Sequence, residues 1–430
     1  MLARWLYTLL FYLATPLLVF RLYQRARTNP GYRARIAERF GLYGDRAGLA
    51  SSIWLHTVSV GEFMAAQPLI NKLRETHPDL PLVITTMTPT GSERVRAALS
   101  AEIAAGQVVH VYLPYDLPDA INRFLSRFNP RLLVVMETEL WPNLIHFSWL
   151  RRIPVVIANA RMSEKSALGY QKLPMLTRPM LREITLVAAQ SEQDGERLVE
   201  MGLPPATLQV TGTVKFDLKL DESLLAKAEK LRRHWGTERR VFIAASTHPG
   251  EDEQVLEAFR LIHCEMPEAL LVLVPRHPER FEPVAELLQQ QGWCFARYSA
   301  GDPVTADTAV VLGDVMGELL PMLGAADVAF VGGSLEPVGG HNMLEPLAMG
   351  TPVITGPHVF NFRMVAELLT ELGVLITVTT PLGLAQAVLA LFRDEPRRLR
   401  LAVDGRQVVF RNRGAVDRLY EHVNRLLTRA

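Results

Sequence analysis

The chain has 430 residues, of which 49% are hydrophobic and 21% are charged, and its formal net charge is +1. This length favours two domains of ordinary size. The nearly balanced charge excludes the large basic surface that nucleic-acid binding requires, so we expect a folded protein without a nucleic-acid partner.

The first predicted element is an apolar run from Trp5 to Phe20, followed by seven arginines within residues 21–46. An apolar segment with a basic flank is typical of a membrane anchor whose arginines stay on the cytoplasmic side. The run is shorter than the roughly 20 residues of a comfortable spanning helix, and Pro16 would bend it, so a short span and a segment lying in the interface both stay open. The alternative is a cleaved signal peptide, but no small-residue cleavage site follows and the dense arginine opposes export. We therefore assign residues 1–23 to a membrane anchor.

After the basic flank, short β-branched runs alternate with helical segments. Strands that are apolar almost throughout are typical of parallel sheets covered on both faces, and the helices between them indicate doubly wound α/β domains. The pattern pauses near residues 212–221, where we place the domain junction. The predicted strands are 53–58, 82–86, 108–112, 132–136, 155–158 and 186–189 in the first set, and 241–245, 270–274, 310–312, 328–331, 353–354 and 375–378 in the second.

Two successive domains of this kind match the two-domain glycosyltransferase architecture (GT-B type), in which the site lies between two Rossmann-like domains. We assign residues 24–212 to an N-terminal, acceptor-binding domain and 213–395 to a C-terminal, nucleotide-sugar-binding domain. Residues 396–430 are predicted to be arginine-rich amphipathic helices. In this architecture such an ending often packs back on the N-terminal domain, and we expect the same here by analogy of fold.

The only cysteines are Cys264 and Cys294, and we expect two buried thiols in a reducing compartment. The eleven histidines show no paired ligand spacing, and the chain contains no Asp-x-Asp motif. We therefore expect no metal site and no cofactor.

The first predicted strand ends in His56-Thr-Val-Ser-Val-Gly-Glu62, and a helix is predicted to begin at about Phe63. A carboxylate at the carboxyl end of a parallel strand points into the crevice where such sheets bind ligands. The helix N-terminus stabilises its ionised form, so we expect Glu62 to be unprotonated at neutral pH and able to accept a proton. Position alone leaves open the alternative that Glu62 only complements the helix dipole.

The fourth predicted strand leads into Met136-Glu-Thr-Glu-Leu-Trp-Pro-Asn143, at the same edge of the same sheet. Glu137, nearer the strand end, is the better candidate for the crevice, whereas Glu139 is expected to be an N-terminal charge of the next helix. Lys215, in the junction, could face an anion, although a lone lysine is usually solvated.

In the second domain, a glycine-rich stretch from Gly332 to Pro346 directly follows an apolar strand. Its four glycines allow the backbone to approach a ligand closely, and a helix predicted to start near His341 would direct free N–H groups and its positive dipole end at an anion such as a sugar nucleotide. The alternative is a tight strand-to-helix turn that needs glycine only for its backbone angles.

Two further segments follow strands of the same predicted sheet. Arg276, in Val274-Pro-Arg-His-Pro278, could hold a phosphate through two oxygens. The turn from Gly313 to Leu319 could offer backbone N–H groups. These segments converge on one edge of the sheet, which strengthens the prediction of a ligand site.

In combination, these motifs resemble the 3-deoxy-D-manno-octulosonic acid (Kdo) transferases of lipid A assembly. The likeness runs from the N-terminal anchor to the last helix, and the stretches that carry it are His56–Glu62, Met87–Glu93, Tyr112–Asp116, Met136–Asn143, Val274–Arg280 and Gly332–Glu345.

The resemblance implies transfer of Kdo from CMP-Kdo to the tetraacyldisaccharide bisphosphate precursor of lipid A (lipid IVA), at the cytoplasmic face of a Gram-negative inner membrane. By motif position, Glu62 matches the catalytic base, and Glu137 and Lys215 match residues that stabilise the transition state. The matched CMP contacts are Pro275, Arg276, Met316, Gly317, Glu318, Asn342, Met343, Leu344 and Glu345, with Gly339, Gly340 and His341 as a supporting loop. Met343 is a departure, since many relatives are expected to carry proline there.

The same resemblance implies metal-independent displacement with inversion, because a nucleoside monophosphate leaves with less charge than a diphosphate. Two alternatives stay open: a nucleotide-sugar 2-epimerase of the same architecture, which would need no anchor, and a membrane-tethered sugar-nucleotide sensor without turnover.

Overall fold

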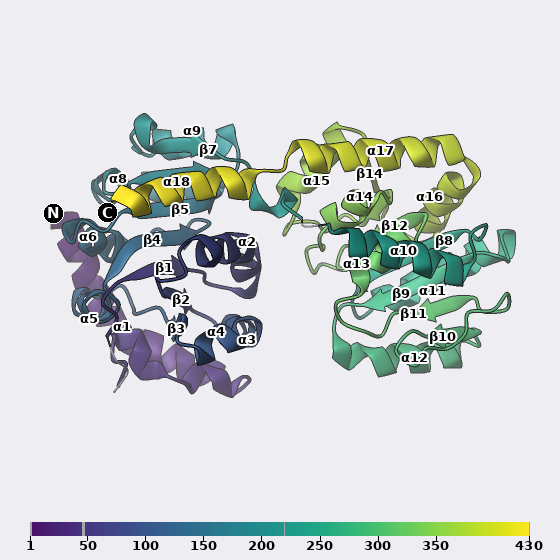
Figure 1. The fold of residues 1–430 in the computed structure, drawn as a ribbon, viewed down its shortest axis with the longest axis horizontal. Coiled ribbons are helices and arrows are strands. Elements are labelled where there is room, and N and C mark those ends of the chain that lie inside the picture. Colours follow the sequence, from purple (N-terminus) through teal and green to yellow (C-terminus); the bar gives the residue numbers. More distant parts are fainter. Residues whose placement is uncertain (1, 45–47, 219, 430) are drawn as a thin grey trace. The chain divides into compact units, whose positions relative to one another are not determined.

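The computed structural model describes residues 2–44, 48–218 and 220–429. The chain forms two compact units (Figure 1): unit 1 comprises the described residues up to Asp217 and from Arg413 onward, and unit 2 comprises Leu218 to Asn412. The predicted boundary at residue 212 falls inside unit 1, so Lys215 belongs to unit 1. The predicted C-terminal segment is divided, since its first helix lies in unit 2 and its last helix in unit 1.

Unit 1 contains a sheet of seven parallel strands in the order β3-β2-β1-β4-β5-β6-β7. The strand order reverses between β1 and β4, which is the switch point where doubly wound sheets bind ligands. The strands are β1 (Ser52–His56), β2 (Leu82–Thr86), β3 (Val108–Tyr112), β4 (Pro130–Met136), β5 (Val155–Ala160), β6 (Leu186–Ala189) and β7 (Leu208–Val210).

Helices cover both faces of this sheet, as the apolar strands require. Alternate residues of β1 enter opposite cores: Trp54 packs with Phe124 on one face, and Ile53 packs with Phe63 on the other. The helices are α1 (Leu2–Arg25), α2 (Val60–Thr76), α3 (Pro89–Ala98), α4 (Ser100–Ala104), α5 (Pro118–Phe128), α6 (Pro142–Leu150), α7 (Glu164–Gln171), α8 (Pro174–Arg182), α9 (Glu192–Glu200) and α18 (Ala415–Arg429), with 3-10 turns η1 (Pro30–Arg33), η2 (Ile36–Phe40), η3 (Pro205–Thr207) and η4 (Val214–Phe216).

Unit 2 repeats the architecture with seven parallel strands in the order β10-β11-β9-β8-β12-β13-β14. Its switch point lies between β8 and β12. The strands are β8 (Val241–Thr247), β9 (Leu270–Pro275), β10 (Phe295–Arg297), β11 (Val310–Leu312), β12 (Val328–Val331), β13 (Val353–Thr355) and β14 (Leu375–Thr377); the helices are α10 (Glu222–Trp235), α11 (Glu251–Glu265), α12 (Phe281–Gln290), α13 (Leu319–Gly324), α14 (Leu344–Met349), α15 (Arg363–Glu371), α16 (Pro381–Arg393) and α17 (Glu395–Arg411), with the 3-10 turn η5 (Pro278–Arg280).

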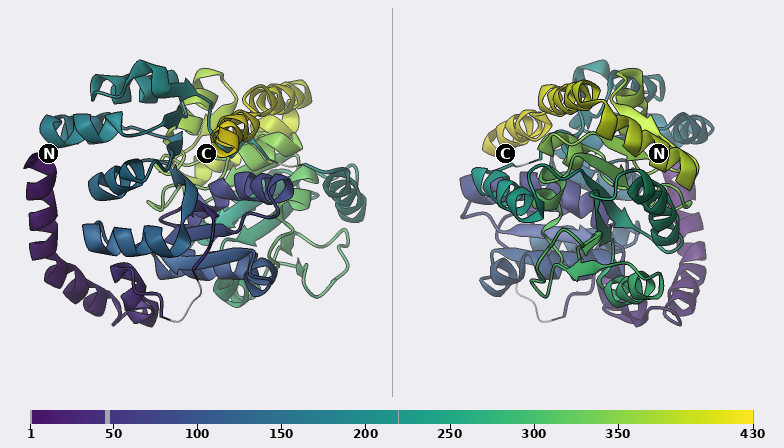
Figure 2. Two further views of the ribbon diagram at one scale, coloured as in Figure 1. Left: turned by 60° about the vertical axis from the view of Figure 1, so that its left-hand side comes forward. Right: turned by 90° about the vertical axis from the view of Figure 1, so that its right-hand side faces the viewer.

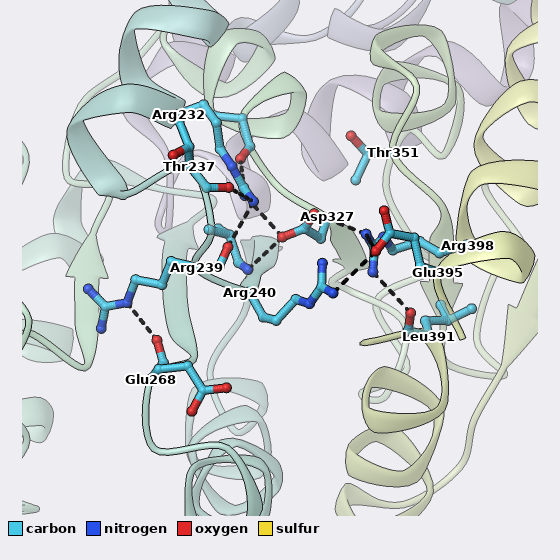
Figure 3. Close-up of polar contacts among 12 residues, drawn as sticks. Arg232, Thr237, Arg239, Arg240, Glu268, Asp327, Thr351, Leu391, Glu395 and Arg398 are labelled. Carbon is cyan, nitrogen blue, oxygen red and sulfur yellow. Dashed lines mark hydrogen bonds and ion pairs between the residues drawn. The ribbon is translucent and has the colours of Figure 1, made fainter. Parts of the chain in front are cut away.

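The amino ends of the unit 2 strands are held by a polar network (Figure 3). Asp327, just before β12, accepts hydrogen bonds from Val241 N at 2.8 Å and from Arg232 of α10 at 3.0 Å. The buried guanidinium of Arg398 in α17 lies 3.8 Å from the same carboxylate. This edge is opposite to the carboxyl ends of the strands, so the network stabilises the unit away from the predicted site.

Helix α1 has 24 residues with Pro16 inside it, and it is long and apolar enough to cross a membrane by length and composition alone. It lies along the outer edge of unit 1 (Figure 2). The basic flank is not uniform. Arg21, Arg25 and Arg27 are exposed, whereas Arg39 is buried and donates to Met87 O at 2.9 Å. Arg46 lies outside the described residues.

The prediction of two buried thiols is wrong. Cys264 on α11 and Cys294 before β10 are both exposed free cysteines. Cys294 lies between Trp293 and Phe295, and Cys264 lies between His263 and Glu265. Neither pattern reveals which face of the element the side chain occupies.

Candidate functional site

In unit 1, Glu62 lies at the switch point, on the first turn of α2 directly behind β1. Helix α2 begins at Val60, earlier than the predicted start near Phe63. The carboxylate accepts hydrogen bonds from Val58 N at 2.7 Å and from Ser59 Oγ at 3.3 Å, and the side chain is buried. These bonds fix the carboxyl group at the carboxyl end of β1.

The pKa of Glu62 is raised to about 7. Burial is the largest cause, the negative charges of Glu137 and Glu139 also raise the pKa, and the Val58 N–H and the Ser59 hydroxyl oppose them. The prediction that Glu62 is unprotonated at neutral pH is therefore wrong in degree, because desolvation outweighs the helix terminus. At pH 7 the carboxyl group is divided between its two forms.

Glu137 directly follows β4, on the other side of the switch point. Its backbone is left-handed with φ of 56°, and its N–H donates to Ala158 O at 2.8 Å. A left-handed conformation costs a non-glycine residue about 1 kcal/mol or more, so the turn is held by its surroundings. Asn159, at the end of neighbouring β5, is also left-handed at 54°.

Lys215 lies on η4, beside Glu137. Burial lowers the pKa of Lys215, the nearby Glu137 carboxylate raises it, and Arg161 lowers it. Asn159 Oδ1 accepts a hydrogen bond from Val214 N at 3.2 Å, which holds η4 against the end of β5. The structure thus brings Glu137 and Lys215 together, although they are far apart in sequence.

Glu139 differs from its predicted role as an N-terminal helix charge. It precedes α6, whose N-cap is Trp141, and its carboxylate accepts a hydrogen bond from the Trp141 indole at 2.9 Å. Burial raises the pKa of Glu139, and the charge of Glu137 raises it further. Glu139 therefore belongs to the carboxylate group around Glu62. Neither Glu139 nor Arg161 is among the site residues that the sequence predicts.

In unit 2, the glycine-rich loop follows β12 at the second switch point. The buried carboxylate of Glu251, on the first turn of α11, accepts four backbone hydrogen bonds. The donors are Gly333 N at 2.6 Å, Ser334 N at 2.9 Å, Leu335 N at 2.9 Å and His248 N at 3.0 Å. This one side chain fixes the start of the loop.

The second half of the loop differs from the prediction. The N–H groups of Gly339 and Gly340 donate to Gly333 O at 3.0 and 2.6 Å, so they close the loop on itself. The helix predicted near His341 begins at Leu344 and has six residues. Asn342 Oδ1 accepts from Leu344 N at 3.1 Å, and its amide donates to Glu345 at 3.1 Å, so Asn342 organises this turn.

Positive and aromatic side chains gather beside the loop. The Nε2 atoms of His248 and His341 are 2.8 Å apart, and His277 stands edge-on to His248 with ring centroids 5.4 Å apart. The pKa of His341 is lowered to about 3, first by burial and then by Arg276 and the other two histidines. Burial raises the pKa of Glu345, whereas Arg276 lowers it. Exposed Arg276 therefore lies close to both His341 and Glu345.

The remaining predicted contacts fall into two groups. Met316 and Gly317 are exposed in the turn after β11, Gly317 has φ of 89° with open space at its Cα, and Glu318 pairs with Lys227 at 3.2 Å. In contrast, the side chains of Pro275, Met343 and Leu344 are buried. A ligand that touches the second group would therefore meet backbone atoms.

Comparisons with known proteins identify the family of this chain. Residues 34–218 match the family model described as 3-deoxy-D-manno-octulosonic-acid transferase. The chain is 46% identical to 3-deoxy-D-manno-octulosonic acid transferase from Haemophilus influenzae over 99% of both chains. It is 40% identical to the Bordetella pertussis protein of the same name over 85% of both chains.

Solved structures support the fold alone. A glycosyltransferase from Rickettsia africae covers 89% of this chain and is covered in full, with 14% identity and a TM-score of 0.55. A UDP-GlcNAc 2-epimerase from Neisseria meningitidis covers 84% of this chain and 99% of its own, with 14% identity and a TM-score of 0.52. The architecture is therefore common to both enzyme classes and does not decide between them, whereas the sequence relatives do. The chain belongs to the 3-deoxy-D-manno-octulosonic acid transferase family, whose members are glycosyltransferases of lipopolysaccharide biosynthesis.

Proposed function

We propose that this transferase moves Kdo from CMP-Kdo to the bisphosphorylated tetraacyldisaccharide precursor of lipid A, by direct displacement with inversion and without a bound metal. The observation that carries the proposal is the buried carboxyl group of Glu62, with a pKa raised to about 7, at the switch point of unit 1. A general base works best when its pKa is close to the operating pH.

In the proposed reaction, Glu62 takes the proton from a primary hydroxyl of the acceptor as that oxygen forms its bond to the anomeric carbon of Kdo. The bond from this carbon to the CMP phosphate breaks, and CMP leaves with its electron pair. Lys215 and Glu137, which interact with each other, stabilise the transition state around the reacting centre.

In unit 2, we assign the phosphate of CMP to Arg276, whose guanidinium is exposed beside His341 and Glu345. We also assign the exposed turn at Gly317 and the loop held by Glu251 to the lining of the nucleotide site, beside Arg276. Because the N–H groups of Gly339 and Gly340 are already bonded to Gly333 O, we assign these glycines to loop shape.

Metal independence follows from the charge that has to be stabilised. CMP departs with a single phosphate, and a guanidinium can hold that phosphate through two parallel hydrogen bonds. We expect turnover to persist in excess chelator. Loss of activity with chelator and its recovery on adding a divalent cation would contradict this part of the proposal.

Location is proposed from family and sequence together. The apolar N-terminal helix and the exposed Arg21, Arg25 and Arg27 support attachment to the cytoplasmic face of the inner membrane, where the acceptor lipid is found.

The test is incubation of the whole chain with CMP-Kdo and the lipid A precursor, followed by mass spectrometry of the lipid. We expect mass increments of whole Kdo units, which also count the sugars added. The configuration at the new linkage, read by NMR, tests inversion. Free sugar epimer formed without acceptor would favour the epimerase alternative, and CMP binding without any product would favour a sensor.

A further inference from the structure

Helix α1 has two faces of unusual character along its whole length. The residues turned toward unit 1 recur at helical spacing and include polar side chains, namely Arg4, Tyr7, Thr8 and Thr15. The residues turned away are large and apolar, with exposed fractions of 55% to 81%. They are Leu2, Trp5, Leu6, Leu9, Leu10, Leu13, Leu17 and Phe20.

A surface helix in water buries its apolar stripe and exposes its polar one, whereas α1 leaves a continuous stripe of large apolar residues exposed. The contacts of the inner face are specific. Thr8 exchanges hydrogen bonds of 2.9 and 3.1 Å with the buried side chain of Asn143, and Tyr12 donates to Asp119 at 2.6 Å.

The attachment continues to the far end of the helix. Leu22 is buried with Tyr115, Leu117 and Ala120, and Phe11 and Leu18 pack against the same cluster. Since α1 is bound to unit 1 from Arg4 to Leu22, it cannot cross a bilayer without drawing the polar surface of unit 1 into hydrocarbon, which is prohibitive.

We propose that α1 lies in the plane of the membrane as part of unit 1, with its Leu2 to Phe20 face in the lipid and its opposite face, which carries both polar and apolar residues, on the protein. The occupant of the apolar face is therefore an anionic phospholipid bilayer. Exposed Arg21, Arg25 and Arg27 at the end of the helix complement the negative headgroups. The inference rests on the proposed membrane location and adds the orientation of the helix.

The first experiment measures binding of the full chain to vesicles of phosphatidylethanolamine and phosphatidylglycerol by sedimentation. Leu9→Lys should weaken partitioning about tenfold or more, the loss expected when one leucine no longer enters the lipid and a charge replaces it. Leu382→Lys is the matched control, because Leu382 on α16 has the same 56% exposure as Leu9. Equal binding of the two variants would overturn the proposal.

The second experiment separates the in-plane arrangement from a span. In a background with Cys264→Ser and Cys294→Ser, single cysteines at Leu6, Leu13 and Phe20 carry a nitroxide label whose depth is measured by EPR. The proposal predicts one shallow depth of about 5–10 Å for all three. A depth that peaks at Leu13 near the bilayer centre would overturn the orientation alone, whereas failure of the unmodified protein to bind vesicles would contradict the membrane location itself.

Discussion

Glu62 occupies the first turn of α2, where the helix terminus and burial act on its carboxyl group in opposite directions. The terminus and two hydrogen bonds favour the ionised form, and burial with two neighbouring carboxylates favours the protonated form. The effect of burial is the larger, and the pKa of Glu62 is raised to about 7. The same environment that makes Glu62 a competent base also makes its ionised form costly to the fold.

Glu62→Gln should lower kcat by about 10²–10⁴-fold, because an amide cannot accept the proton of the acceptor hydroxyl. In the unaltered enzyme, kcat/KM should rise with pH and level off above about 7, since only the ionised carboxylate acts as base. Steady-state kinetics from pH 5.5 to pH 9 test both expectations. Glu75→Gln, an exposed position on the same helix, should leave the rate unchanged. A normal rate in the Glu62 variant would refute the assignment.

The pKa of Glu62 also predicts a pH-dependent cost in stability. Its folded pKa lies above the ordinary value of 4.5, so the folded state favours the protonated form, and stability is lost as pH rises from about 4.5 to about 7. The free energy of unfolding of the Glu62→Gln variant should therefore exceed that of the unaltered protein by more at pH 8 than at pH 4.5. The expected difference between the two pH values is up to about 3 kcal/mol. Urea unfolding at the two pH values measures this difference, and an equal effect at both would contradict it.

Among the elements, the loop after β12 depends on one carboxylate. Each oxygen of Glu251 accepts two N–H groups: Oε1 from Ser334 and Leu335, and Oε2 from Gly333 and His248. The bonds join the ends of β8 and β12 across the switch point. Glu251 therefore shapes the proposed donor site without having to touch the donor.

Glu251→Gln should distort the loop, because in either orientation the amide NH₂ faces two N–H donors and leaves them unsatisfied. We expect the free energy of unfolding to fall by about 2–4 kcal/mol. The KM for CMP-Kdo should rise, and the KM for the acceptor should change little. Glu253→Gln, the same change at an exposed position of α11, is the control. If the two variants share the same donor KM, the proposed role of Glu251 is incorrect.

The strands show which secondary-structure elements can be predicted from sequence patterns. All twelve predicted strands exist, because long apolar runs in a parallel sheet leave a clear signal. The edge strands β7 and β10 are absent from the predicted set, since each has three residues and is only partly buried.

The site divides in the same way. Positions after strands, such as Glu62, Glu137 and Arg276, can be predicted because parallel strands end at one edge. The participation of Glu139 and the anchoring of the loop by Glu251 could not be predicted, because both depend on tertiary contacts. The raised pKa of Glu62 could not be predicted either, because the sequence does not show how deeply the side chain is buried.

At the scale of the molecule, the two units differ in how the chain builds them. Unit 2 is one continuous segment from Leu218 to Asn412 with its own two cores. Unit 1 needs the C-terminus: Asp217 accepts hydrogen bonds of 2.5 Å from both Gly414 N and Val416 N, and α18 completes the core beside β1 and α2. The buried residues of α18 are Ala415, Val416, Leu419, Val423 and Leu427.

This asymmetry predicts the behaviour of fragments. Residues 218–412 should fold alone and bind CMP, because all proposed nucleotide contacts lie within them. Residues 1–217 alone should fail to fold, since losing α18 removes about 5–10 kcal/mol of apolar burial, comparable with the whole stability of a domain. Joining residues 413–430 to residue 217 through a flexible linker should restore folding. Thermal melts followed by circular dichroism test the folding of the three fragments, and titration calorimetry tests CMP binding by residues 218–412. A cooperative melt of residues 1–217 alone would contradict the role given to α18.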